Sequence, residues 1–287
     1  MTINGLRSEC DVMLEGAGIA DHKTDAMLLM MHALKVSRDH ILAHGSDPVD
    51  DDKAVALREL VRIRCDHVPL QHITGHQEFM GLDFAVNEHV LVPRLDTECL
   101  VEEAMIETQD GMRVLDLCTG SGCILISLMK YKNQITGIGT DISDKALEVA
   151  MENAASNGVD AVFLQGDLYA ALDDSPAVNE GSGSRFDVII SNPPYIRSDV
   201  IPTLMEEVKD HEPISALDGG SDGLMFYRRI IEGADEWLTP GGCILFEIGY
   251  DQGSAVSGML SDKDYRDVTV IKDFAGLDRV VKGHKRI

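Results

Sequence analysis

The most restrictive feature of the sequence is an alternation of short apolar segments with amphipathic segments that begins after Gly111. Strands are predicted at 112–118, 135–143, 161–167, 186–191 and 243–249, and helices at 122–131, 144–158 and 223–238. We expect Gly158 to close the second helix, and Pro240 with Gly241 to end the third. Strands that alternate with helices form a mostly parallel sheet with helices on both faces. The sequence therefore predicts an α/β, doubly wound domain.

Residues 1 to about 65 have a pattern that predicts a small helical bundle. The segment 24–36 is apolar on all sides, and the segment 51–65 begins with an Asp cluster suited to a helix N-terminus. A further helix is predicted at 95–107, where Asp96 or Thr97 is suited to be the N-cap.

The segment between these regions predicts a connection built on a β-hairpin. Residues 78–86 alternate between apolar and polar side chains around Gly81. We therefore expect three parts: a helical domain at 1–70, a hairpin linker at 71–94 and the α/β domain at 95–287.

The charge balance bears on the kind of partner. The chain has 25 Lys and Arg against 49 Asp and Glu, a formal net charge of −24. A surface this negative repels phosphate backbones, although it also simply promotes solubility. The six cysteines form no C-x-x-C pair and the ten histidines are scattered, so we expect reduced thiols and no metal site. The sequence shows no signal peptide and no apolar run of membrane-spanning length, so we expect a cytoplasmic protein without a membrane partner.

Two glycines, Gly120 and Gly122, lie where the first strand of the alternating region meets its helix. Glycines at this place let a ligand approach the backbone, and the helix N-terminus offers free N–H groups. The segment matches neither the G-x-G-x-x-G nor the G-K-[ST] pattern, so a phosphate site is not indicated. A tight turn between strand and helix accounts for the two glycines equally well.

Acids at the ends of the next two strands favour a ligand over a simple turn. Asp141 ends the second strand and Asp167 ends the third. A carboxylate at the end of the second strand is suited to accept hydrogen bonds from ribose hydroxyls. A ribose joined to a tail without phosphate fits this loop, and S-adenosylmethionine is such a ligand. Its cationic sulfonium and amino groups complement the acids.

The fourth strand runs directly into Asn192, Pro193, Pro194 and Tyr195. The prolines have no N–H, and Pro193 holds the backbone of Asn192 extended. The Asn192 side-chain oxygen and the Pro193 carbonyl are therefore suited to accept the two N–H groups of a planar –NH₂, with Tyr195 stacked on its plane. This arrangement would orient a weak nucleophile toward a methyl group. The alternative is a proline-rich turn with a core tyrosine.

These motifs together resemble the peptide chain release factor glutamine methyltransferases. The segment "NPPY" follows "DLCTGSG", as in the class I methyltransferases that methylate planar nitrogens. The resemblance covers about 65–287 and includes the N-terminal segment by architecture. Its more specific motifs are "PLQHITGHQEF" (69–79), "VLVPRLDTECLVEEA" (90–104), "HEPISALDGGSDGLMFYRRII" (211–231) and "DFAGLDRVV" (273–281).

The resemblance implies a seven-stranded methyltransferase sheet that uses S-adenosylmethionine. The implied reaction is methylation of the side-chain amide nitrogen of the glutamine in the Gly-Gly-Gln motif of release factors. The implied catalytic residues, which would hold the glutamine, are Asn192, Pro193, Pro194 and Tyr195. The implied cofactor-binding residues are Cys118, Thr119, Gly120, Ser121 and Gly122 near the methionine part, Asp141 on the ribose, Asp167 and Leu168 beside the adenine, and also Asn192.

The sequence departs from the family pattern at two positions. The family usually has Gly where Cys118 stands and Pro where Leu95 stands, and Cys118 places a side chain beside the expected cofactor tail. Arg94 is a candidate substrate contact, and a structural ion pair explains it equally well. We expect residues 1–70 to dock the protein substrate because they contain no strand-end motif.

Two other functions fit the same motifs. One is the same chemistry on another glutamine of a translation protein, or on an exocyclic amine of a nucleic acid. The other is a cofactor-binding scaffold without catalysis, which the intact Asn192 and Tyr195 oppose. The charge and the lack of a basic patch argue against direct nucleic acid binding. We expect a monomer.

Overall fold

The computed structural model describes residues 1–173, 175–179 and 185–287. The chain forms two compact units. The helical unit comprises 1–76 and 205–211, and the sheet unit comprises 77–204 and 212–287. Within the described residues, no helix has both the length and the apolar character needed to cross a bilayer.

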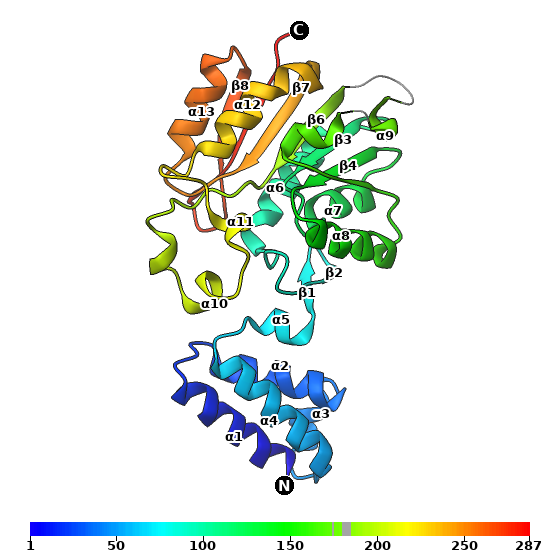
Figure 1. Ribbon diagram of the computed structural model, residues 1–287. Helices are drawn as coiled ribbons and strands as arrows, with labels where there is room; N and C mark the ends of the chain where they lie inside the picture. Colours follow the sequence, from blue (N-terminus) through cyan, green and yellow to red (C-terminus); the bar gives the residue numbers. More distant parts are fainter. Residues whose placement is uncertain (174, 180–184) are drawn as a thin grey trace. The chain divides into compact units, whose positions relative to one another are not determined.

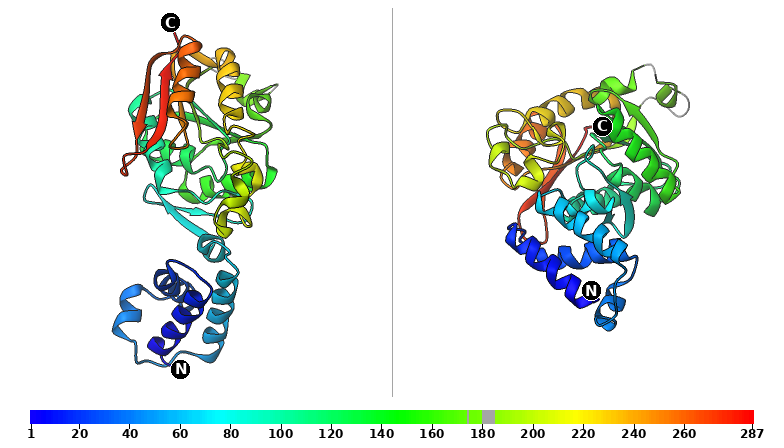
Figure 2. Two further views of the ribbon diagram at one scale, coloured as in Figure 1. Left: turned by 90° about the vertical axis from the view of Figure 1, so that its left-hand side faces the viewer. Right: turned by 60° about the horizontal axis from the view of Figure 1, so that its bottom comes forward.

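The first 76 residues confirm the helices predicted at 24–36 and 51–65, and they contain three further helices. The helices of this part of the helical unit are α1 (Ile3–Gly16), α2 (His22–Leu34), α3 (Arg38–Ala43), α4 (Asp51–Cys65) and α5 (Leu70–Thr74). Asp51 and Asp52 lie in the first turn of α4, where negative charge favours the helix dipole. The helices, blue to cyan in Figure 2, bury one apolar core that includes Leu6, Leu29 and Leu57.

A segment distant in sequence completes this unit. Residues 205–211 contain α10 (Glu206–Lys209). The buried Arg64 guanidinium donates to Glu207 Oε1 at 2.6 Å and to Asp25 Oδ2 at 2.7 Å. His211 Nε2 also lies 3.0 Å from the carbonyl oxygen of Asp66. Because a buried guanidinium needs acceptors on several sides, Arg64 attaches this late segment to the early helices.

The predicted hairpin is present as β1 (His76–Phe79) and β2 (Leu82–Ala85). Gly81 adopts the positive φ of 70° that its turn requires. Residues 71–74 belong to helix α5, so the hairpin occupies only part of the expected 71–94 linker. The buried Asn153 amide pairs with the backbone of Ala85 on β2 through both of its polar atoms, at 2.7 and 3.0 Å.

The sheet unit contains the expected seven-stranded, mostly parallel sheet. The strands are β3 (Arg113–Leu117), β4 (Thr136–Asp141), β5 (Val162–Gln165), β6 (Phe186–Ser191), β7 (Leu238–Glu247), β8 (Arg266–Lys272) and β9 (Asp278–His284). Their order is β5-β4-β3-β6-β7-β9-β8. The first five of these strands pair in parallel, and β9 is antiparallel to both β7 and β8.

Helices cover both faces of this sheet, as Figures 1 and 2 show. The helices are α6 (Leu95–Glu107), α7 (Cys123–Tyr131), α8 (Asp144–Asn157), α9 (Pro176–Asn179), α11 (Ile214–Leu217), α12 (Met225–Trp237) and α13 (Gly253–Asp262), with 3₁₀ turns at Leu168–Leu172 and Ile201–Thr203. On β6, Ile189 packs in the core under α12 and α13, whereas Val188 and Ile190 pack in the core under α6 and α7. This two-residue alternation makes the strands apolar on both sides.

Two local expectations were wrong, and one was confirmed. The N-cap of α6 is Arg94, so Asp96 and Thr97 lie inside the helix rather than at its cap. Helix α12 ends at Trp237, and Pro240 and Gly241 belong to the first part of β7, where the register with β6 shifts. The shift explains how a proline is tolerated there. Gly158 is the C-cap of α8 with a φ of 65°, as expected.

Gly139, on β4, lies so close to its neighbours that a larger residue there tests the packing of the sheet. A Cβ at Gly139 would lie 2.8 Å from the Phe163 ring and 2.9 Å from Thr119 Oγ1. We predict that Gly139→Ala lowers the free energy of unfolding by about 1–3 kcal/mol, because the added Cβ would displace the Phe163 ring and the buried Thr119, whose hydroxyl is hydrogen-bonded to Asp116. Urea denaturation measures the change.

The matched control is Gly258→Ala, in the middle of α13, where an added Cβ meets no atom within 4 Å. This substitution should raise the free energy of unfolding by about 0.5–1 kcal/mol through helix propensity. Equal effects of the two substitutions would contradict the packing described for β4.

Candidate active site

Three of the five residues in the loop after β3, residues 118–122, have positive φ values. Cys118, Gly120 and Gly122 have φ values of 61°, 54° and 78°. Gly122 is also tightly packed, since a Cβ there would lie 2.8 Å from Ile126. A Cβ at Gly120 would meet no atom within 4 Å, so this position is open. The positive φ of Cys118 is uncommon for a non-glycine residue, and glycine would adopt it without strain.

Asp116, on β3, stabilises this loop through a hydrogen bond to Thr119. It is fully buried, and its Oδ2 accepts a hydrogen bond of 2.6 Å from Thr119 Oγ1. Burial raises the pKa of Asp116 to about 7, against the lowering effect of the Thr119 hydroxyl. The carbonyl oxygen of Ser121 accepts from Asn153 Nδ2 at 2.9 Å, so α8 also holds the loop.

Asp141, the last residue of β4, ties this strand to the glycine loop. Its Oδ2 accepts from the Gly120 N–H and its Oδ1 accepts from the Ser143 N–H, both at 2.9 Å. Burial raises the pKa of Asp141, and these backbone hydrogen bonds oppose the rise. Because each carboxylate oxygen has two lone pairs, the group retains acceptor capacity for a ligand.

The end of β5 presents one exposed and one buried residue. The exposed Asp167 accepts from Arg229 Nη2 at 2.7 Å. The next residue, Leu168, is buried with a φ of 54°, a conformation that is uncommon for a non-glycine residue. Arg229 was not anticipated from the sequence, because its partner lies 62 residues earlier.

Residues 192–195, which follow β6, form side-chain hydrogen bonds with residues of α6 and β7. Asn192 Nδ2 donates to Thr97 Oγ1 at 3.4 Å, and the Tyr195 hydroxyl donates to Glu247 Oε1 at 3.2 Å. Pro193 and Pro194 are buried, and Tyr195 is half-buried. Burial raises the pKa of Tyr195, so its phenol stays neutral.

The segment after Glu212 packs against this strand end. Ile196 N–H donates to the Leu217 carbonyl at 2.9 Å, and Gly219 N–H donates to the Ile196 carbonyl at 2.8 Å. A Cβ at Gly219 would lie 2.7 Å from Tyr195 Cα. Only glycine therefore allows this close approach of the two chain segments.

These strand ends open into one cavity of about 260 Å³. Its lining comes from the loop before α6, the ends of β3, β4, β5 and β6, the 213–218 segment and α12. The expected site residues that line it are Cys118, Thr119, Gly120, Ser121, Asp141, Asp167, Leu168, Asn192 and Pro194. Gly122, Pro193 and Tyr195 are not among its lining residues and lie directly beside residues that are.

Known proteins are similar to this chain over most of its length. Residues 6–75 match the family described as the PrmC N-terminal domain, and residues 108–250 match a methyltransferase domain family. A release factor glutamine methyltransferase of Geobacter sulfurreducens is 40% identical over 93% of this chain and 90% of its own length. One of Clostridium botulinum is 41% identical over 96% of this chain and 98% of its own length. This chain belongs to the release factor glutamine methyltransferase family.

A solved methyltransferase of Pyrococcus furiosus shares the fold. Its TM-score is 0.53 at 20% identity, and the match covers 72% of this chain and 90% of that one. The seven-stranded sheet is thus that of a class I methyltransferase, and the chain is a methyltransferase.

In this family member, Arg94 forms an ion pair. Its Nη2 lies 2.8 Å from both carboxylate oxygens of the buried Glu212. Glu212 Oε1 also accepts from the Val92 N–H at 3.2 Å. The structure therefore shows the ion pair that the sequence allowed for Arg94, and Arg94 also lines the edge of the cavity.

Two further site residues were missed by sequence reasoning. Thr97 was interpreted as a possible helix cap, yet it lines the cavity and contacts Asn192. Glu247 was included in a strand without comment, yet it is the partner of Tyr195. A charged residue at the carboxyl end of an otherwise apolar strand was the available signal for Glu247.

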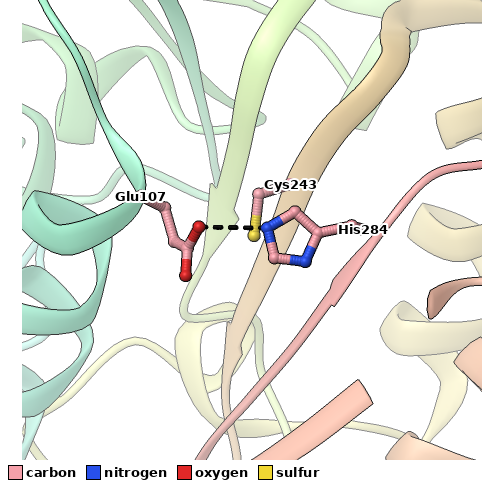
Figure 3. Close-up of side chains that lie close together, drawn as sticks. All are labelled: Glu107, Cys243 and His284. Carbon is pink, nitrogen blue, oxygen red and sulfur yellow. Dashed lines mark hydrogen bonds and ion pairs between the residues drawn. The ribbon is translucent and has the colours of Figure 1, made fainter. Parts of the chain in front are cut away.

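A second cluster of polar side chains lies elsewhere in the sheet unit. Figure 3 shows Glu107 of α6, Cys243 of β7 and His284 of β9 near one another, with their potential ligand atoms within 4.8 Å. Glu107 Oε2 is 3.0 Å from His284 Nε2, and its Oε1 accepts from Lys282 Nζ at 2.7 Å. Burial raises the pKa of Glu107, but its bonds to Lys282 and His284 lower it more. Because the Lys282 ammonium would repel an added divalent cation, we interpret the cluster as a salt-bridge network.

The raised pKa of Asp116 predicts a pH-dependent stability. The folded protein holds the proton up to about pH 7, whereas the unfolded chain releases it near the ordinary value of 3.8. Between these values the folded state binds more protons, so this group makes the protein less stable as the pH rises. Between pH 4 and pH 8, the free energy of unfolding of Asp116→Asn should fall by roughly 2–4 kcal/mol less than that of the wild type.

Urea denaturation of both proteins across this range tests the prediction. The control is Asp110→Asn, which removes the same charge from an exposed position. Parallel stability profiles for the wild type and Asp116→Asn would show that the buried carboxyl does not titrate in this range.

Proposed function

We propose that this chain transfers a methyl group from S-adenosylmethionine to the side-chain amide nitrogen of the glutamine in the Gly-Gly-Gln motif of peptide chain release factors. The observation that carries the proposal is that Asn192 and Pro194 line the same cavity as Asp141 and Gly120. One cavity can therefore hold a methyl donor and a planar amide next to each other. The names of the relatives support this substrate.

The cofactor half of the cavity has features that suit S-adenosylmethionine. The open space at Gly120 admits a ligand close to the backbone, and Asp141 has acceptor capacity for ribose hydroxyls. Asp167 and Leu168 would border the adenine. The acids complement the positive charge of the ligand. When bound, S-adenosylmethionine supplies an electrophilic methyl group on its sulfonium.

The substrate half acts through orientation. An amide nitrogen is a weak nucleophile because its lone pair is delocalised. We propose that Asn192 Oδ1 and the Pro193 carbonyl accept its two N–H groups, and that the Tyr195 ring limits the plane of the amide. Fixing the reacting atoms in line supplies several kcal/mol of the barrier. The neutral side chain of Asn192 does not act as a base. As the bond from the amide nitrogen to the methyl carbon forms, the sulfur–methyl bond would break to leave S-adenosylhomocysteine, and the nitrogen would give up one N–H proton to water.

The cofactor assignment predicts a binding defect in Asp141→Ala. Loss of a charge-assisted acceptor pair should weaken S-adenosylmethionine binding by about 1.5–3 kcal/mol. Isothermal titration calorimetry measures this, with Asp144→Ala, an exposed acid in the first turn of α8, as the control. Unchanged affinity in Asp141→Ala would show that the ribose is held elsewhere.

The substrate assignment predicts that Asn192→Ala cuts the methyl-transfer rate by about 100-fold or more, because positioning is lost. Cofactor affinity should change far less. Single-turnover transfer to a whole release factor, followed by intact mass, measures the rate. Asn192→Asp keeps one acceptor and should retain partial activity. Near-normal transfer by Asn192→Ala would mean that the strand end is only a turn.

We also propose that the helical unit docks the release factor. A groove of about 580 Å³ in this unit is lined by three cations, Arg7, Lys23 and Arg38, and by one acid, Asp11, which contacts His22, together with apolar side chains that include Met27 and Met31. None of the three cations has an ion pair among the residues described. In a chain with a net charge of −24, such a groove is suited to an acidic, partly apolar surface of a protein partner.

Charge reversal tests the docking proposal. Lys23→Glu combined with Arg38→Glu should raise the KM for the release factor roughly tenfold and leave cofactor affinity unchanged. The control reverses two charges of α4, Lys53→Glu with Arg62→Glu, which lie outside the groove. Equal KM values for the two double variants would remove the groove from the docking surface.

A further inference from the structure

The turn between β8 and β9, residues 273–277, lies at the edge of the sheet that holds the cavity. Strand β9 is antiparallel to β7, and Val280, near the start of β9, is opposite Glu247, the last residue of β7. Because β7 is parallel to β6, its end lies at the edge where Asn192 follows β6. The turn that precedes β9 therefore lies at the same edge as the strand ends that line the cavity.

Arg279 joins this turn to a helix that lines the cavity. Its Nη2 lies 3.0 Å from Asp273 Oδ2 in the turn and 3.0 Å from Asp96 Oδ2 in the first turn of α6. Asp96 is followed by Thr97, which lines the cavity and accepts a hydrogen bond from Asn192. Two ion pairs of one arginine thus attach the turn to the start of α6, beside the cavity.

One buried carboxylate fixes the conformation of the turn. The Asp273 side chain is 5% exposed, and its Oδ1 accepts from the N–H groups of Ala275 and Leu277 at 2.9 and 3.0 Å. Its Oδ2 accepts from Arg279, and its carbonyl oxygen accepts from the Gly276 N–H at 2.9 Å. A turn held in this way loses little conformational freedom when a partner binds, which favours affinity.

This ordered turn presents a phenylalanine to solvent. Phe274 is 98% exposed, and Leu277 is 45% exposed. Leu95, the first residue of α6, is 73% exposed. A single exposed apolar side chain needs no explanation. Here, however, three of them lie on two segments that one arginine joins beside a cavity, and aromatic side chains are enriched in protein interfaces.

We propose that Phe274, Leu277 and Leu95 form an apolar surface that binds the release factor at residues flanking its Gly-Gly-Gln motif. When a glutamine amide reaches Asn192, the backbone on either side of that glutamine lies outside the cavity, which also has to hold the methyl donor. Consecutive residues advance by at most about 3.5 Å, so the flanking residues pass over the side chains around the cavity. The three side chains carry no charge, so the surface suits apolar residues of the partner. This inference rests on the proposed function, because it requires a glutamine in the cavity.

Binding of a whole release factor to Phe274→Ser tests the surface. Isothermal titration calorimetry in the presence of S-adenosylhomocysteine measures the Kd without turnover. We expect the Kd to rise about 5- to 30-fold relative to the wild type, because an aromatic anchor is lost. The KM for the release factor should rise as well, with kcat and the cofactor Kd within about twofold of the wild type. Phe274→Tyr keeps the ring and should bind within about threefold of the wild type.

Two further variants separate this surface from exposed apolar residues in general. Leu95→Ser should raise the Kd about 3- to 10-fold, since an aliphatic side chain buries less area than an aromatic one. The matched control is Ile106→Ser, because Ile106 is 68% exposed in the last turn of the same helix. It lies about 16 Å further along the helix axis, so this variant should bind as the wild type does. Circular dichroism establishes that each variant is folded.

If Phe274→Ser binds as tightly as the wild type, or if Ile106→Ser loses as much affinity, the proposed surface is wrong. Light scattering of the free proteins tests another occupant. A wild-type dimer that Phe274→Ser converts to a monomer would show that the surface binds a second copy of this chain instead. A wild type that binds the release factor without methylating it contradicts the proposed function, and the Kd comparison still decides the surface. A wild type that binds no release factor overturns both.

Discussion

Parallel pairing of β3 with β4 on one side and with β6 on the other is the constraint on which the site depends. The register places Leu117 opposite both Thr140 and Ser191, so the residues that follow emerge together at one edge of the sheet. The edge is then joined by hydrogen bonds from Gly120 to Asp141 and from Ser191 Oγ to the Leu117 carbonyl. A shift of one residue would turn the side chains of a strand to the opposite face and separate these groups.

Much of this arrangement was predictable because its signals are local. Period-2 and period-3.6 patterns identify the strands and helices, and Gly158 marks a helix end through its own backbone preference. The strand ends of a parallel sheet share an edge, so Asp141, Asp167 and Asn192 were expected together before any contact was known. The cavity that these residues line agrees with that expectation.

The features that sequence reasoning missed depend on contacts between distant segments. Arg64 and Glu207 are 143 residues apart, and nothing in either local pattern places 205–211 in the helical unit. Thr97 likewise has a local interpretation as a cap, whereas its contact with Asn192 spans 95 residues. Pro240 indicated a helix end, but the register shift of β7 tolerates it inside a strand.

The central claim is that one cavity orients a glutamine amide for methyl transfer, and the position of the transferred methyl group tests it most directly. A release factor incubated with this protein and S-adenosylmethionine is digested, and the modified residue is identified by fragmentation mass spectrometry. The account predicts one added methyl group, on the side-chain nitrogen of the glutamine in the Gly-Gly-Gln motif. A methyl group on another residue, or a release factor left unmodified by the folded, cofactor-bound protein, would contradict it.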